Sequence, residues 1–444
     1  MRQRIVRLSL VGGVVVLALL LLLSMCGGGT KSGDKKDGAE PKKPVPTSTS
    51  TGTGPATQLT VPEAYTTRRG WELIGTSPDY AVSRTTGRLA YLERTAEGEY
   101  RLRTIESETG RAGWSGQSWR PPAGLHFPHL LTVTADDHEY FVTWSYGKVG
   151  PDAPAPAERI VSLDTYAVED GSRRRVEVPW NEAPTVSGNG PGILIGDGGT
   201  GSAVVDPATG RVTQVPAAKL KYPKDCASCK RLTEVRGLTS KGLLLSGARE
   251  FWVQGGWFSR KNAPKGTDPR SGVPTSVTRG VLLAKWQLDK KSKRARTHEM
   301  WTVHDTETGK ALVSVECHRP AIAPGQYPQA VLSPSGDYLV AGNLAFDLDA
   351  KKGFCFEDTD GSTSLVLASV TDEGTAYGAT NVRNAADALA GGGFPALADV
   401  SAGTADTLSP NVRVPGGEGA EGVGLFRWTD EKDRQHLIGY PRAD

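Results

Sequence analysis

Short polar turns alternate with runs of β-branched and apolar residues along most of this chain. The first turn of each unit separates two such runs, as in AVSRTTGRLAYL and AVLSPSGDYLVAG. Seven turns of this kind are centred on Gly87, Asp137, Gly190, Gly242, Gly280, Gly336 and Gly374. They span 287 residues in six intervals, a mean period of about 48 residues. Apolar runs of this length between turn residues predict short β-strands in a repeating array.

A second turn follows the first in every unit, and its chemistry is that of a β-hairpin. IESETGRAGW, VVDPATGRVTQV and VHDTETGKALVSV each carry a strand, an acidic residue and then Thr-Gly. The acidic and Thr side chains can accept hydrogen bonds from nearby backbone N–H groups, and Gly takes the positive φ that closes the turn. The glycines of these turns are Gly110, Gly210 and Gly309, with weaker versions at Gly171, Gly353 and Gly403 and a substitute, FWVQGGWF, at Gly255. Each unit therefore offers four strands.

Four-stranded units at this period predict an all-β fold, a β-propeller of seven blades. The turns resemble those of the quinoprotein-like and WD40-like propeller superfamily, in which a strand ends in Asp before x-x-Thr-Gly-Lys. The resemblance covers residues 66–444. A lone strand, GWELIG, precedes the first unit, and a hairpin, GLFRWTDEKDRQHLIGYP, follows the last. Strands from both ends are expected to share a blade and close the ring. Eight blades, one of them split between the termini, is the alternative.

The N-terminal segment predicts export and a membrane tether. Three arginines within the first seven residues precede an uncharged stretch of 19 residues from Leu8 to Cys26. As a helix it would span about 28 Å, close to a hydrocarbon core, and the basic flank keeps that end in the cytoplasm. LSMC also resembles a bacterial lipobox with Cys26 as the lipidated residue, although Met25 departs from the small residue of that pattern. A transmembrane anchor, a lipoprotein and a released protein stay open as alternatives, the last without an A-x-A cleavage site.

The sequence predicts three segments along the chain. Residues 1–26 form the anchor or lipoprotein signal, residues 27–60 a disordered linker rich in Gly, Lys, Pro, Ser and Thr, and residues 61–444 the propeller domain. The linker has almost no apolar content, so it cannot bury enough surface to become ordered. The formal net charge of +3 gives no argument for a nucleic-acid partner. The expected location is the cell membrane, with the propeller on its extracytoplasmic side.

Apart from Cys26 the chain has four cysteines, an even number that fits an oxidising location. The economical pairing joins Cys226 with Cys229 in CASC, and Cys317 with Cys355, one blade apart. A redox pair would need a strand-to-helix context, and zinc would need two further ligands, for which Cys317 and His318 are the candidates. Two structural disulfides are therefore predicted, with metal binding and redox chemistry as the alternatives.

The sequence contains few motifs typical of catalysis or cofactor binding. GDGGTG from Gly196 to Gly201 matches a dinucleotide fingerprint, but a strand and turn follow where a helix would have to begin. The chain has no G-x-S-x-G motif, and DTDG at 358–361 predicts a turn rather than a calcium site. A quinone-dependent dehydrogenase of the resembling superfamily would carry adjacent cysteines and regular tryptophan docking motifs. No two cysteines are adjacent, and the ten tryptophans are not expected to recur at one blade position. No cofactor and no metal is therefore predicted.

Two basic clusters and one aromatic loop remain as surface features. KWQLDKKSKRARTHE carries five cations in one hairpin loop, and Arg173 to Arg175 form the second cluster. Both are expected to be solvated loops, with contact to an anionic envelope polymer or lipid surface as the alternative. Trp252 and Trp257 in FWVQGGWFSRKN are expected in core packing, with an exposed binding surface as the alternative.

Together these features predict a membrane-tethered, extracytoplasmic β-propeller that binds an envelope protein, peptide or glycan and catalyses no reaction. The alternative is a lyase or hydrolase with a polar site at the funnel, where side chains of the innermost strands converge. The candidates for that site are Asp136, Asp137, His138 and Asp197. If three or more of them share one pocket with perturbed pKa values, the enzyme hypothesis gains support.

Overall fold

The computed structural model describes residues 54–123, 127–149, 159–224, 226–320, 327–357 and 364–443. The predicted anchor with Cys26, most of the predicted linker and the DTDG turn lie outside these residues. In the part of the chain that the structure describes, no helix is long and apolar enough to cross a membrane.

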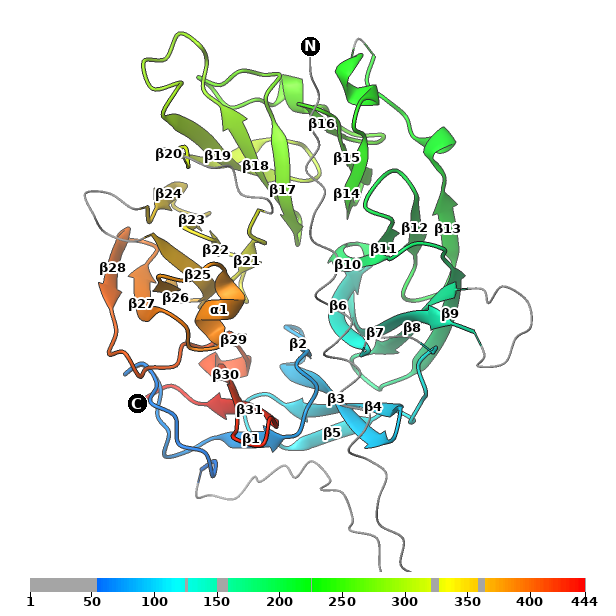
Figure 1. Ribbon diagram of the computed structural model, residues 1–444, viewed down its shortest axis with the longest axis vertical. Coiled ribbons are helices and arrows are strands. Elements are labelled where there is room, and N and C mark those ends of the chain that lie inside the picture. The colour runs from blue at the N-terminus through cyan, green and yellow to red at the C-terminus, as the bar shows by residue number, and fades with distance from the viewer. Residues whose placement is uncertain are drawn as a thin grey trace, which may run out of the picture. The chain divides into compact units, whose positions relative to one another are not determined.

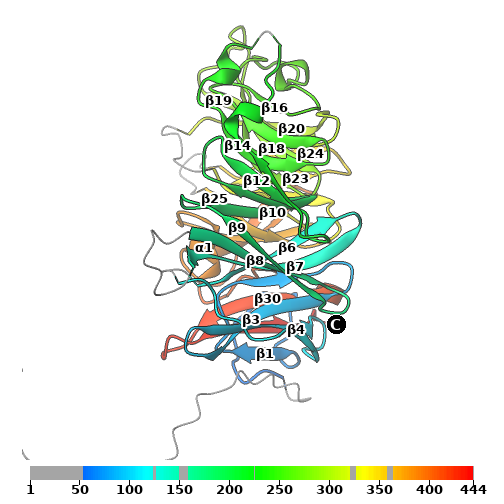
Figure 2. The same cartoon turned by 90° about the vertical axis from the view of Figure 1, so that its right-hand side faces the viewer.

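Eight antiparallel sheets are arranged radially around a central opening (Figure 1), and Figure 2 shows the same ring from its side, with β7, β8 and β9 toward the viewer. We number the blades along the chain by their innermost strands. Blade 1 contains β2 (Tyr80–Val82), β3 (Arg88–Ala96), β4 (Glu99–Glu106) and β5 (Ala112–Ser115). Blade 2 contains β6 (His129–Ala135), β7 (His138–Lys148), β8 (Arg159–Ala167) and β9 (Arg173–Pro179). Blade 3 contains β10 (Thr185–Gly190), β11 (Gly192–Gly196), β12 (Ser202–Val205) and β13 (Val212–Val215). Blade 4 contains β14 (Glu234–Thr239), β15 (Gly242–Ser246) and β16 (Phe251–Val253); where a fourth strand was expected after FWVQGGWF, there is an isolated bridge between Trp252 and Phe258.

The other four blades complete the ring. Blade 5 contains β17 (Val273–Thr278), β18 (Val281–Gln287), β19 (His298–Asp305) and β20 (Ala311–His318). Blade 6 contains β21 (Val331–Leu332), β22 (Tyr338–Ala341), β23 (Leu344–Asp347) and β24 (Lys352–Cys355). Blade 7 contains β25 (Leu365–Val370), β26 (Thr375–Thr380), β27 (Phe394–Asp399) and β28 (Thr404–Thr407). Blade 8 contains β29 (Gly417–Glu418), β30 (Gly424–Thr429), β31 (Gln435–Tyr440) and β1 (Trp71–Ile74). Short helical turns lie between strands: η1 (Ala217–Lys219), η2 (Ser228–Lys230), η3 (Ser259–Lys261), α1 (Ala385–Leu389) and η4 (Ala420–Gly422).

The prediction of seven blades is wrong, because the ring has eight. The eighth blade is shared by the two ends of the described chain: β1 pairs antiparallel with β31, so that Trp71 lies opposite Gly439 and Ile74 opposite His436. The turn pattern misses this blade because its third and fourth strands are far apart in sequence and no hairpin turn joins them. The predicted sharing of a blade between both ends is confirmed. The ring is thus closed by a strand from the N-terminal part of the described chain, which completes the last blade.

A buried polar contact holds the closing strand in place. The Glu72 carboxylate on β1 accepts hydrogen bonds from the Thr57 backbone N–H at 3.0 Å and from its hydroxyl at 2.6 Å. It also lies 2.6 Å from Nδ1 of His436 on β31. Since both the Glu72 and His436 side chains are buried, each needs the other as a partner.

Apolar side chains of neighbouring blades form the core. One cluster joins Val142 and Val161 of blade 2 to Ile193 and Ile195 of blade 3, and all four are fully buried. A second cluster packs Leu92 of blade 1 against buried apolar side chains of blade 2. The hydrophobic layer therefore runs between the sheets, and each blade is stabilised mainly by the two beside it.

Three tryptophans occupy one equivalent position, which corrects the expectation that they would not recur. Each comes from the outermost strand position of a blade, and its indole N–H donates to a backbone oxygen in the second hairpin turn of the next blade. The pairs are Trp71 with Ser107 at 2.8 Å, Trp114 with Val168 at 2.9 Å, and Trp257 with Thr306 at 2.9 Å. Each ring also covers the glycine three residues further along, where an added Cβ would collide with it. The sequence hides this equivalence because Trp71 belongs to the closing strand and Trp257 follows β16, outside a regular strand.

Candidate functional site

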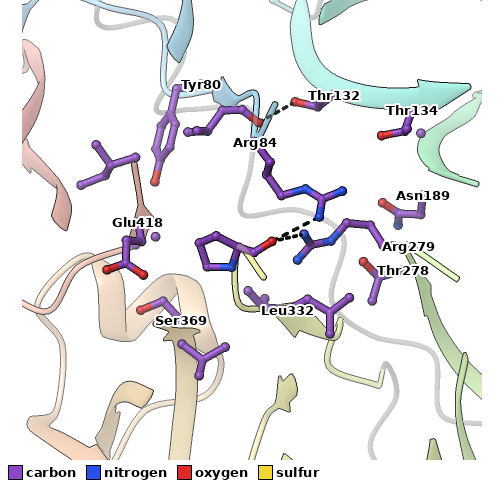
Figure 3. A pocket seen from close by; sticks show the side chains of 18 of the residues that line it. Tyr80, Arg84, Thr132, Thr134, Asn189, Thr278, Arg279, Leu332, Ser369 and Glu418 are labelled. Carbon is purple, nitrogen blue, oxygen red and sulfur yellow. Dashed lines mark hydrogen bonds between the residues drawn. The ribbon is translucent and has the colours of Figure 1, made fainter. Parts of the chain in front are cut away.

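A cavity of about 300 Å³ lies in the central opening of the ring. Its lining comes from the innermost strands of seven blades and the turns that follow them; only blade 4 contributes nothing. Figure 3 shows the labelled side chains converging from opposite sides of the opening. Because every blade presents its first strand to the ring axis, this is the one place where residues from nearly the whole repeat meet.

Two arginines from opposite parts of the ring meet at one end of this cavity. Arg84 Nη1 donates to the Pro334 carbonyl oxygen at 3.2 Å, and Arg279 Nη1 donates to the same oxygen at 3.3 Å. Arg279 Nη2 also donates to the Ser333 oxygen at 2.7 Å. Figure 3 shows the two guanidinium groups side by side, with dashed lines to the same carbonyl oxygen. We call this end, formed by Arg84, Arg279 and Pro334, the channel mouth.

The blade topology explains why these residues share one end of the channel. Each belongs to a turn between the first and second strand of a blade, and such turns all emerge at the same end of the ring. Arg279 has a φ of 38° and the following Gly280 a φ of 82°. A left-handed conformation is uncommon for Arg and costs free energy, so the surrounding structure must hold it in place.

The channel mouth holds two guanidinium groups close together, with the Glu139 and Asp372 carboxylates near them. Burial, and then repulsion from Arg84, lower the pKa of Arg279 to about 10 although Glu139 and Asp372 oppose the shift, so Arg279 is charged at neutral pH. No carboxylate of the described residues forms an ion pair with Arg279. Arg84 has only a long contact, 3.8 Å from Nε to Glu139 Oε1. The two carbonyl acceptors supply partial charges only, which leaves the mouth able to take an anion.

Glu139 holds the Arg84 turn and also places a negative charge beside both arginines. Its Oε2 accepts hydrogen bonds from Ser83 Oγ at 2.6 Å, from Thr85 Oγ1 at 2.9 Å and from the Thr85 backbone N–H at 3.1 Å. Burial acts to raise the pKa of Glu139, but these hydrogen bonds and Arg84 lower it overall. The carboxylate is therefore ionised, and its oxygens are largely occupied by the backbone and hydroxyls of the turn from which Arg84 extends.

Small polar side chains line the channel next to the arginines. Thr134, Asn189 and Thr278 lie on three different blades, and their side chains have no hydrogen-bond partner among the described residues. Leu332 and Val370 add apolar surface to the lining of the cavity. Such a lining, with a few donors among apolar surface, is typical of sites that hold a ligand in a defined orientation.

An acidic groove of about 850 Å³ adjoins the channel mouth on the same end of the ring. Glu418 lies at the boundary between groove and channel, and its carboxylate contacts Arg442 at 2.8 Å. Burial raises the pKa of Glu418 although Arg442 opposes the shift. Asp372 Oδ1 accepts from the Ser335 backbone N–H at 2.7 Å. Glu108, Glu373 and Glu421 also line the groove, so carboxylates border the arginine site on this side.

The four residues predicted for a funnel site are placed apart from the cavity. Asp136, Asp137 and His138 are exposed in the turn from β6 to β7, and none of them lines the channel cavity. Asp136 and Asp137 have φ values of 48° and 62°, which makes them turn formers. Asp197 lies in the turn from β11 to β12, at the other end of its blade. Its carboxylate accepts from the backbone N–H groups of Gly199 at 2.7 Å and Gly201 at 3.1 Å. The structure therefore does not bring the four together.

The sequence offered only a weak signal for the arginines. Both Arg84 and Arg279 occur in turn segments that the periodicity identifies, AVSRTTGRLAYL and SVTRGVLLAKW. Nothing in either segment distinguishes these arginines from solvated turn residues. A cation directly before Gly at a tight first turn was the only local hint, and it applies to Arg279 alone.

Both predicted disulfides are present. Cys226 pairs with Cys229 at a Cα–Cα distance of 5.4 Å, and Cys317 with Cys355 at 5.9 Å. The second bond joins the outermost strands of blades 5 and 6. Both pairs lie outside the channel cavity.

Comparison with known proteins adds no argument about the fold or the function of this chain. No protein-family model matches the chain, and no curated protein matches it. Among solved structures, an uncharacterized protein from Listeria monocytogenes EGD-e matches with 9% sequence identity and a TM-score of 0.33, over 79% of this chain and 98% of that chain. A similarity this distant carries no functional argument. The assignment as an eight-bladed β-propeller rests on the sheet topology of the chain itself.

Proposed function

We propose that this protein is a non-catalytic binding module that holds an anionic group of a partner at the channel mouth. The observation that carries the proposal is the convergence of Arg84 and Arg279 on one carbonyl oxygen with no carboxylate paired to Arg279 among the described residues. Two guanidinium groups held together in a partly buried site repel each other. A bound carboxylate, sulfate or phosphate relieves that repulsion and accepts charge-assisted hydrogen bonds.

The partner that fits this site is an acidic peptide segment or an acidic glycan of the cell envelope. A cavity of about 300 Å³ is large enough for one or two residues of a chain but not for a folded domain. The unpartnered hydroxyls and amide of Thr134, Asn189 and Thr278 can bind the polar backbone of such a chain. We place this binding event outside the cytoplasm, with the propeller tethered to the membrane by its N-terminal segment. The two disulfides and the apolar stretch from Leu8 to Cys26 support that location.

Titration calorimetry with a tetraglutamate peptide tests the proposal, with tetraglutamine as the uncharged probe. We expect the wild-type protein to bind the acidic peptide in preference to the neutral one at low ionic strength. The variant Arg84→Gln/Arg279→Gln should bind it at least about tenfold more weakly, since a hydrogen bond to a charged group contributes about 1.5–3 kcal/mol. Removing the cation pair also relieves repulsion, so the variant should be folded and no less stable.

The control is Arg249→Gln/Arg270→Gln, which removes the same charge from exposed positions outside the cavity. If this control weakens binding as much as the channel variant does, the peptide is responding to overall charge and the channel proposal fails.

Photo-crosslinking in intact cells tests the envelope partner separately. A photoreactive phenylalanine analogue in place of Leu332 would sit in the channel wall. We expect it to capture an envelope component, and the Arg84→Gln/Arg279→Gln background should reduce the yield. Capture of cytoplasmic proteins alone would refute the proposed location while leaving the anion site intact.

A further inference from the structure

The loop from β18 to β19, residues 288–297, projects the strongest basic cluster of the chain into solvent. Lys290, Lys291, Lys293 and Arg296 are exposed, and none of them forms an ion pair with a carboxylate of the described residues. Arg319, which follows β20, adds a fifth unpaired cation: its Nη2 donates to the Ala295 oxygen at 3.3 Å. We call these five side chains the blade 5 cation patch.

Backbone hydrogen bonds hold this loop in a fixed set of turns. Ser292 N donates to the Asp289 oxygen at 2.8 Å, and Ala295 N donates to the Ser292 oxygen at 3.2 Å. His298 N donates to the Arg294 oxygen at 2.9 Å, and Arg319 N to the Thr297 oxygen at 2.7 Å. The cations are therefore presented by an ordered backbone, which reduces the conformational entropy lost when a ligand binds.

The acidic residues beside the patch do not neutralise it. Glu316 is engaged by Arg294, at 2.9 Å from Nη2 to Oε2, and Glu357 by His318, at 2.7 Å. Asp289 accepts the Lys291 backbone N–H at 2.9 Å and caps the turn. Of these three carboxylates, that of Asp289 is the one not already paired with a cation, and it lies in the same loop as the patch.

The side chains of the second basic cluster, unlike those of the patch, are bound within the protein. Arg173 and Arg175 both bind Asp164, each with an Nη2 to Oδ2 distance of 2.9 Å. Arg174 Nε donates to the Ala208 oxygen of the neighbouring blade at 3.0 Å. All three have structural roles, so of these two clusters the one at blade 5 is available to an external anion.

We propose that the blade 5 cation patch binds a linear polyanion, a polymer with regularly repeated phosphate, sulfate or carboxylate groups. Cations that follow one another along a projecting loop match charges spaced along a chain. A lipid bilayer fits less well, because interfacial binding normally buries apolar side chains. The large exposed apolar residues of the described structure include none from residues 288–297.

This patch is independent of the channel mouth. The β18–β19 loop joins the second and third strands of its blade, whereas Arg84 and Arg279 lie in turns between first and second strands. Since successive hairpin turns alternate between the two ends of a blade, the patch and the channel mouth lie at opposite ends of the ring. Either site can therefore be removed without touching the other.

Fluorescence titration with long-chain inorganic polyphosphate over a series of KCl concentrations tests the proposal. Five phosphate contacts predict a plot of log affinity against log salt with a slope of about −4. In the variant Lys291→Glu/Lys293→Glu the slope should fall to about −2 and the affinity at low salt by at least about tenfold. Both lysines are exposed, so the variant should keep the wild-type melting temperature.

The matched control is Lys310→Glu/Lys352→Glu, the same charge reversal in turns at the opposite end of the ring. We expect its slope and affinity to stay close to wild type. Equal losses in the two variants, or a wild-type slope near zero, would overturn the proposal. Tighter binding to anionic phosphatidylglycerol vesicles than to polyphosphate would overturn it in favour of a lipid surface. The Arg84→Gln/Arg279→Gln variant should bind polyphosphate normally, which separates this site from the proposed function.

Discussion

The disulfide between Cys317 and Cys355 should contribute about twice as much to stability as the disulfide within CASC. It connects β20 of blade 5 to β24 of blade 6 and closes a loop with a sequence separation of 38. The bond from Cys226 to Cys229 closes a loop with a separation of only 3. Because a disulfide stabilises mainly by restricting the unfolded chain, the longer loop should matter more.

The chain-entropy relation gives the size of the difference. A separation of 38 corresponds to about 4 kcal/mol at room temperature, and a separation of 3 to about 2 kcal/mol. For a domain of this size, a loss of 4 kcal/mol lowers the melting temperature by about 5 °C, and a loss of 2 kcal/mol by about half that. Alanine is the suitable replacement, since Cys317 and Cys229 are buried and alanine adds no polar atom to the core.

Equilibrium unfolding in urea checks this prediction on Cys317→Ala/Cys355→Ala and on Cys226→Ala/Cys229→Ala. Thiol titration of the denatured wild-type domain first establishes that both bonds are formed. A CASC variant that loses as much free energy of unfolding as the long-loop variant, or more, would refute the argument from loop length. Native strain, rather than the entropy of the unfolded chain, would then control both values.

The remaining predictions concern blade docking and acid sensitivity. Gly309→Ala should reduce the free energy of unfolding by about 2–4 kcal/mol, since its φ is 75° and a Cβ there would overlap the Trp257 ring. Gly266→Ala, at a φ of 84° with no atom within 4 Å of the added Cβ, should cost only about 1 kcal/mol in the same urea assay; equal losses would refute the docking argument. Burial lowers the pKa of His304 to about 4, below its unfolded value of about 6.5, so the unfolded chain takes up the proton first. The free energy of unfolding is therefore not reduced by this group above pH 6.5, and it falls by about 3 kcal/mol as the pH drops toward 4. The variant His304→Leu should flatten this part of the profile of unfolding free energy against pH.

Local chemistry predicted the strands, the turns and the disulfides well. The first turns at Gly87, Gly280 and Gly336 all have positive φ, as do the second turns at Gly110 and Gly309. These features depend on a few neighbouring residues, so the sequence displays them directly. The predicted number of blades was wrong because the eighth blade takes its outermost strand, β1, from the other end of the described chain, and no turn connects β1 to β31.

The sequence did not predict the candidate site either, because its residues come from segments far apart in the chain. Arg84 and Arg279 belong to blades 1 and 5, and only closure of the ring brings their guanidinium groups to one carbonyl oxygen. Residue type alone pointed to Asp136 and Asp197 as funnel residues. The direction of their hairpins places them at opposite ends of their blades.

The sequence by itself determined a repeated four-stranded β unit, its hairpin turns and its cysteine pairs, because periodicity, turn chemistry and cysteine spacing are properties of short segments. Tertiary structure alone decided the number of blades, the docking of Trp71, Trp114 and Trp257, and which basic residues remain without a partner. Arg173 and Arg175 are paired with one buried carboxylate, whereas the cations of the blade 5 cation patch are paired with none among the described residues. Charge neutralisation and ring closure depend on distances between segments far apart in the chain, and those distances exist only once the ring has formed.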